Sequence, residues 1–275
     1  MSTATVEPEP AKAPRRSIVV AGVLVLLFAV VAAYALGESN SSTKKVVEVV
    51  APVTTTTTGR NCIPGAAAGS CNTDEFAEQQ IAYKPLNAAT QAELGAQLVA
   101  ARAAAMRYPT VADAERAGML LAGKFSPLTG AHFINIAGAV GGAFDPSQPG
   151  SYIYDGISPS SRVIGLMYLS SGLNASAKPP AGFAGPNDLW HRHSNTCVVY
   201  ANGKINVPFP ADSNVTQAMC DAKHGVFMVR TTWMVHAWVV PGWESPSGVF
   251  SHDNAHVLCA DGTTKTDASG FCLGT

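Results

Sequence analysis

The stretch Asn195–Phe209, "NTCVVYANGKINVPF", decides the fold class. Two runs rich in β-branched residues flank Asn202-Gly203, and this dipeptide is the strongest short signal for a β-hairpin because both residues accept the positive φ of a tight turn. Other short apolar or alternating runs are bounded by turn residues in the same way. They lie at Ser151–Gly156, Ser161–Ser170, His224–Trp243 and Ala255–Gly262. Residues from about 121 to 275 therefore predict a mostly antiparallel β-barrel or sandwich.

The region before these runs, from about residue 73 to 120, is helical by pattern. Thr90–Glu93 matches a capping box, and apolar residues follow it at helical spacing. We expect a helix from about Thr90 to Arg107, which Pro109 ends. A second cap at Thr110–Asp113 predicts a short helix that runs to about Ala117. With these helices as a cover on the sheet, the predicted fold class is α+β.

An apolar segment near the start of the chain predicts a membrane anchor. Ser17–Leu36 is an uncharged run of about the 20 residues that a helix needs to cross a bilayer. Basic residues precede it, so the preference for Lys and Arg on the cytoplasmic side places residues 1–16 inside and the rest outside. We interpret the segment as an uncleaved single-pass transmembrane helix. An A-x-A pattern at Ala33–Ala35 leaves a cleaved signal as the alternative.

The exported part is expected to be a stalk followed by one domain. Residues 37–60 are rich in Ser, Thr and Val, which is typical of a flexible segment without a core. Residues 61–275 are enough for one sizeable domain. The net charge of −1 and the charged fraction of 13% offer no basic surface, so nucleic acid is not an expected partner. The expected partners are the membrane and an unidentified cell-envelope or small-molecule ligand.

All six cysteines follow the apolar segment, at positions 62, 71, 197, 220, 259 and 272. An even number outside the cytoplasm is typical of disulfides, although sequence does not choose among the pairings. The shortest loops predict the pairs Cys62–Cys71, Cys197–Cys220 and Cys259–Cys272. The alternative for Cys197 is a thiolate metal ligand, because it lies four residues after His193.

Histidines are the candidate metal ligands. Of seven, six fall in three segments: His132; His191 and His193; and His236, His252 and His256. An extended chain turns alternate side chains to one face, so His191 and His193 should lie side by side. His236 belongs to the predicted strand Trp233–Val240, where it shares an apolar face with Met234 and Trp238. A buried imidazole needs a partner, which is either a metal ion or a hydrogen bond.

If the two histidine-bearing strands face each other, their rings can converge on one ion. The expected site consists of His191, His193 and His236, with His132 as the best fourth ligand. Weaker fourth candidates are Asp253, Glu244 and Met167. His252 and His256 lie in a segment read as loop running into strand, so we expect them at the surface or behind the ligands. Zn, Cu, Fe and Mn all accept imidazole, and a nearby thioether from Met167 or Met234 favours copper.

Four segments resemble the pattern of an uncharacterised group of exported bacterial proteins, often of actinobacterial type. They are "GAHFIN" (Gly130–Asn135), "DPSQPGSYIYD" (Asp145–Asp155), "WHRHSNTC" (Trp190–Cys197) and Met234–Asn254. The group's layout is G-x-H-aromatic-x-N, then P-x-x-x-x-Y, then histidines near a final H-x-W segment that ends in P-x-G-x-F. Its members tend to carry a glutamate where this chain has Met167. The resemblance implies a histidine constellation but names no reaction.

A looser similarity connects the chain to cupins, which hold a metal with H-x-H and a later histidine in a small β-barrel. In cupins a glutamate follows the H-x-H, whereas Asn195, Thr196 and Cys197 follow here. A metal ion in such a site would act as a Lewis acid or activate water or oxygen. Whether the protein is an enzyme stays open. The alternative function is a metal-free module that binds a cell-envelope ligand through exposed Trp190, Trp238 and Trp243, its histidines being structural.

Overall fold

The computed structural model describes residues 83–139, 143–170, 179–210 and 213–274. All of these residues belong to one unit, Val53–Thr275. No helix among them is long and apolar enough to cross a membrane. The predicted anchor Ser17–Leu36, the tail before it and the stalk after it lie outside the described residues.

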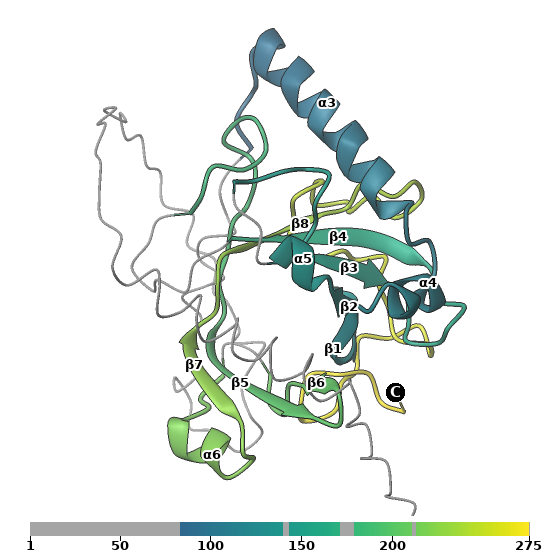
Figure 1. Ribbon diagram of the computed structural model, residues 1–275. Helices are drawn as coiled ribbons and strands as arrows, with labels where there is room; N and C mark the ends of the chain where they lie inside the picture. Colours follow the sequence, from purple (N-terminus) through teal and green to yellow (C-terminus); the bar gives the residue numbers. More distant parts are fainter. Residues whose placement is uncertain (1–82, 140–142, 171–178, 211–212, 275) are drawn as a thin grey trace, which may run out of the picture. The chain divides into compact units, whose positions relative to one another are not determined.

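The predicted β-rich part is one curled, mixed sheet of eight strands (Figure 1). The order of the strands is β7-β5-β6-β1-β2-β3-β4-β8, and every neighbouring pair is antiparallel except β1 and β6. This confirms a β-rich α+β fold. The strands are β1 (Leu120–Ser126), β2 (Gly130–Ile134), β3 (Ser151–Tyr154), β4 (Val163–Leu169), β5 (Ser194–Ala201), β6 (Lys204–Asn206), β7 (Val226–Arg230) and β8 (Met234–Ala237).

The curl brings the two ends of the sheet together at a seam, which we define as residues 191–194 and 230–234. The end strands β7 and β8 follow each other along the chain, β7 pairing with β5 and β8 with β4. Just before β5, His191 forms an antiparallel bridge with Met234 of β8. Each backbone N–H of this pair donates to the carbonyl oxygen of the other at 2.8 Å. The seam therefore fixes the backbone of His191 directly beside the last strand.

The predicted hairpin at Asn202-Gly203 is confirmed. These residues connect β5 to β6 with φ values of 53° and 73°, and the flanking Ala201 and Lys204 are partners in the register. Positive φ at both central positions is the requirement that Asn-Gly meets at low cost. The turn sets the register of β5 and thereby the position of the chain that precedes it.

The predicted helices are present, and the longer one begins and ends two residues earlier than expected. The longer helix, α3, is Ala88–Ala105. Its N-cap is Asn87, whose side chain accepts a hydrogen bond from the Thr90 N–H, so the capping box expected at Thr90–Glu93 is wrong. The Asn87 amide oxygen thus satisfies one of the free N–H groups of the first turn. The capping box at Thr110 is confirmed and begins α4 (Val111–Arg116). The remaining described helices are short: α5 (Ile136–Ala139) and α6 (Gln217–Asp221).

Two predicted strands differ from the structure. The strand expected over Trp233–Val240 ends at Ala237, where the chain leaves the sheet and the Trp238 N–H donates to Val249 O. Ala255–Gly262 contains no strand, and its backbone makes turn hydrogen bonds together with one contact to Leu128, whose N–H donates to Val257 O. Among these, Val257 N–H donates to Asn254 O and Cys259 N–H to Thr263 O.

Two of the predicted disulfides are confirmed, Cys197–Cys220 and Cys259–Cys272. Cys62 and Cys71 lie outside the described residues. Since Cys197 is bonded to Cys220, the alternative of a thiolate metal ligand at this position is wrong. Disulfides of this kind indicate an oxidising compartment outside the cytoplasm.

Candidate metal centre

Five of the seven histidines have their rings close together beside the seam and are called the histidine cluster here. His132 comes from β2, His236 from β8, and His191 and His193 from the segment before β5. His252 comes from the loop after Phe250. Neighbouring ring centroids are 4.6 Å apart for His191 and His252, 5.3 Å for His191 and His193, 5.3 Å for His236 and His252, and 5.5 Å for His132 and His236.

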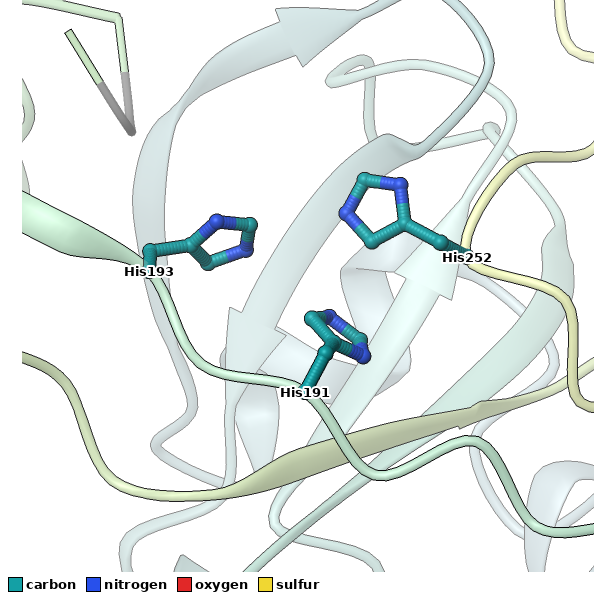
Figure 2. A group of neighbouring side chains, drawn as sticks. All are labelled: His191, His193 and His252. Atoms are coloured by element: carbon teal, nitrogen blue, oxygen red, sulfur yellow. The ribbon is translucent and has the colours of Figure 1, made fainter. Parts of the chain in front are cut away.

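Three members of the cluster form a group that could hold a metal ion. One ring nitrogen from each of His191, His193 and His252 lies within 4.8 Å of the other two. Figure 2 shows the three rings turned toward a common space, with His193 and His252 on opposite sides and His191 between them. An ion bound by imidazole lies about 2.0–2.1 Å from each nitrogen, so small side-chain adjustments bring the three into ligation.

His191 and His193 direct their rings to the same side, as their spacing predicted, although the segment that carries them is not a continuous strand. β5 begins at Ser194, and His191 joins the sheet through the single bridge of the seam. The residue between the two histidines faces elsewhere, because the Arg192 guanidinium carbon lies 4.2 Å from the centroid of the Trp233 ring. This cation–π contact holds the extended backbone in the orientation that directs both imidazoles to one side.

His191 is fully buried, and its ring is fixed in one tautomer. Its Nδ1 lies 3.2 Å from Leu189 O. A carbonyl oxygen only accepts, so Nδ1 carries the proton and Nε2 keeps its lone pair. This Nε2 is buried and has no hydrogen-bond partner. Burial, assisted by the neighbouring imidazoles of His252 and His236, lowers the pKa of His191 well below its ordinary value, so the ring stays neutral. A metal ion would satisfy this nitrogen.

His252 is held by its own loop. Its Nδ1 lies 2.7 Å from Asp253 Oδ1, which leaves Nε2 for the cluster. Behind it, the Ser245 and Ser251 hydroxyls both donate to the Asp253 carbonyl oxygen, at 2.9 and 2.6 Å. The buried Asn254 donates from Nδ2 to Trp243 O. A carboxylate that orients the far nitrogen of an imidazole is typical of metal-binding histidines.

His236 and His132 lie beside this group and face each other. His236 Nδ1 donates to the backbone oxygen of His252 at 2.7 Å, and its Nε2 lies 3.4 Å from Nε2 of His132. Burial is the main cause that lowers the pKa of His132 to about 4 and that of His236 to about 3, and neighbouring imidazoles add to it. Both rings are therefore neutral at physiological pH.

The structure thus brings all four predicted ligands into one cluster, but only His191 and His193 belong to the group of three. The third member is His252, which we expected at the surface or behind the ligands. The signal available for it was the dipeptide His252-Asp253, a histidine with an adjacent carboxylate. His256 is exposed, as expected.

The weaker candidates take other positions. Glu244 is exposed and accepts a hydrogen bond from the Gly242 N–H. Asp253 contacts His252. Met167 lies on β4, where it is the register partner of His236 on β8. The alternative function requires three exposed tryptophans that bind a ligand. Trp190 and Trp238 are instead buried, and Trp243 is half-buried. Trp238 is fixed from inside by a hydrogen bond to Ser251 O.

Comparisons with protein-family models, with curated proteins and with solved structures find no match. The resemblance to exported actinobacterial-type proteins and the similarity to cupins therefore stay predictions. The function has to be inferred from the histidine cluster itself.

Proposed function

We propose that residues 61–275 form an extracytoplasmic metal-binding domain, in which His191, His193 and His252 bind one divalent transition-metal ion. The observation that carries the proposal is the buried Nε2 of His191, which has no hydrogen-bond partner and lies next to two further imidazoles. Leaving such a nitrogen unsatisfied costs about 1–3 kcal/mol. Metal ligation removes this cost and uses all three rings at once.

Three histidine ligands favour an accessible ion with an open position. Structural zinc sites use four protein ligands, whereas catalytic sites use three and leave the fourth position to water or substrate. His191 is buried, but His193 and His252 are only half-buried, so a small molecule approaches from their side. A metal ion in this position supplies Lewis acidity or activates water or oxygen. Imidazole ligands suit Zn, Cu, Fe and Mn.

The location of the domain follows from its disulfides and from the sequence. The pairs Cys197–Cys220 and Cys259–Cys272 support folding in an oxidising compartment. We further propose that Ser17–Leu36 anchors the chain in the cell membrane with the C-terminal domain outside. The partner at the open position would then be a small molecule or a cell-envelope ligand.

Elemental analysis of untagged protein and titration of the metal-free protein with Zn(II), Cu(II), Fe(II) and Mn(II) test this function. The expected result is one ion in the group of three, with affinity falling by a factor of about 100 or more in His193→Gln and His252→Gln. His224→Asn is the matched control, because His224 is exposed and its φ of 54° is tolerated by asparagine. A parent protein that binds none of these ions, or variants that bind as the parent does, would contradict the proposal.

A further inference from the structure

We propose that His132 and His236 form a second metal subsite beside the group of three, so that the histidine cluster binds two ions. The second ion would be a soft transition-metal cation of the Cu(I) type. This inference adds a site to the proposed function and uses different ligand atoms. It rests on how the two rings are held and on which nitrogens face each other.

The first observation is the tautomer of both rings. His236 Nδ1 donates to His252 O, so His236 Nε2 carries a lone pair. The Gly130 backbone acts to raise the pKa of His132, as an acceptor for a ring N–H does. Because His132 Nε2 faces His236, we assign the ring N–H that this acceptor favours to Nδ1, which leaves the lone pair of His132 on Nε2 as well. Two lone pairs then face each other, and this arrangement calls for a cation between them.

The second observation is the distance of 3.4 Å between these two Nε2 atoms. Two nitrogens that bind one ion at about 2.0–2.1 Å with a tetrahedral angle are about 3.3 Å apart. The pair is thus already spaced for one shared ion. A direct hydrogen bond between the rings would instead require one Nε2 to carry a proton, which the carbonyl partners disfavour.

The third observation is the thioether residue paired with His236 in the sheet. Met167 on β4 is the direct register partner of His236 on β8, and it is buried. Directly opposed residues of an antiparallel pair project to the same face of the sheet. The Met167 side chain therefore lies on the face that carries His236. Two imidazoles and a thioether are a donor set that selects soft ions such as Cu(I).

The pair cannot simply complete the group of three. His236 offers only Nε2, since its Nδ1 is bonded to the His252 backbone, and this Nε2 faces His132. The ligand atoms of His191, His193 and His252 lie within 4.8 Å of one another. The histidine cluster therefore contains two sets of ligand atoms, which are in contact through His236, whose ring centroid is 5.3 Å from those of both His191 and His252.

The test is an anaerobic titration of the metal-free, untagged protein with Cu(I) in competition with a chromophoric chelator. The expected stoichiometry is two ions for the parent and one for His132→Gln. Met167→Leu, which keeps the volume and removes the sulfur, should weaken one of the two ions by a factor of about 10 or more. The exposed His256→Gln serves as control and should keep both ions.

The outcomes separate the two proposals. One ion in the parent, lost in His193→Gln and kept in His132→Gln, overturns the second subsite and leaves the proposed function standing. No Cu(I) ion at all overturns the second subsite, whereas the proposed function is overturned only if the divalent ions also fail to bind. Two ions in the parent that persist in His132→Gln place the second ion elsewhere and also overturn the inference. If His132→Gln does not fold, as judged by circular dichroism, the parent stoichiometry and Met167→Leu still decide.

Discussion

His252 and Asp253 form one oriented unit, in which Nδ1 of the ring lies 2.7 Å from Oδ1 of the adjacent carboxylate. Adjacent residues usually project in different directions, but the loop turns here and both Ser245 and Ser251 hold the Asp253 carbonyl oxygen. The ring is thereby aimed at His191, whose centroid is 4.6 Å away. The loop, rather than the sheet, positions the third proposed ligand.

Removing this carboxylate should weaken the metal centre without unfolding the protein. In Asp253→Ala, we expect metal affinity to fall about 10- to 100-fold, because the His252 ring loses both its orientation and the negative charge that raises its basicity. Asp253→Asn should lose less, since an amide oxygen still accepts. Isothermal titration measures the affinities. Asp261→Asn, an exposed carboxylate of the same C-terminal region, is the control, and an Asp253→Ala affinity equal to the parent's would refute the role.

The metal-free protein should become less stable as the pH falls below about 6.5. His132, with a pKa of about 4, and His236, with a pKa of about 3, stay neutral in the folded state, while the unfolded chain takes up protons near the ordinary value. Above pH 6.5 both states are neutral and the rings contribute nothing. Below it, each such ring lowers the free energy of unfolding by about 1.4 kcal/mol per pH unit, until the folded ring titrates as well.

Urea unfolding across this range measures the effect, and His132→Gln isolates one ring. The comparison is needed because burial raises the pKa of Asp188 to about 6, which acts in the opposite direction. Asp188 is protonated more readily in the folded state, so it favours folding as the pH falls. A difference between parent and His132→Gln that does not change with pH would contradict the prediction.

Gly165→Ala should destabilise the sheet next to the histidine cluster. A Cβ at this position would lie 2.8 Å from Cε3 of Trp238. The Trp238 ring is almost fully buried, and its Nε1–H donates a hydrogen bond to Ser251 O, so the ring cannot move aside. We expect a loss of about 1–3 kcal/mol in the free energy of unfolding. Gly95→Ala is the control, because it lies in α3 with open space around it and should stabilise by about 0.5–1 kcal/mol. Equal stabilities of the two variants would refute the argument.

The Cys197–Cys220 disulfide should contribute about 3 kcal/mol to stability, because it closes a loop between cysteines 23 residues apart. The double variant Cys197→Ala, Cys220→Ala is compared with the parent by urea unfolding. In denatured parent protein without reductant, thiol labelling should find no free thiol at these positions or at Cys259 and Cys272. Labelling there would contradict the oxidising compartment.

Local patterns predicted the parts of the fold that short-range interactions determine. The Asn202-Gly203 hairpin and the Thr110 capping box each depend on residues within four positions, and both are present. The start of α3 was missed because two capping residues, Asn87 and Thr90, compete and tertiary context chooses. The disulfides Cys197–Cys220 and Cys259–Cys272 were also predicted from short-range spacing, because each closes a short loop.

The site could be predicted only in part, because it depends on how distant segments meet. The H-x-H spacing predicted His191 and His193 correctly as neighbours. His252 was not predicted, since its loop has no periodicity. The loop is placed by hydrogen bonds from the Ser245 hydroxyl to Asp253 O and from the Asn254 N–H to Leu128 O, which a sequence pattern does not reveal. The apolar residues of Ala255–Gly262 gave the impression of a strand, yet the turns around Gly262 and the Cys259–Cys272 bond prevent one.

A metal ion at the proposed centre would oppose the opening of the sheet at the seam. His191 is both a proposed ligand and the residue whose two backbone hydrogen bonds to Met234 join the ends of the sheet. An ion held between His191 and His252 would tie the seam to the C-terminal loop, so the curled sheet could open there only after the ion leaves. Amide hydrogen exchange at His191 and Met234 would then slow in proportion to metal occupancy, and these two amides would report on the site without any knowledge of the substrate.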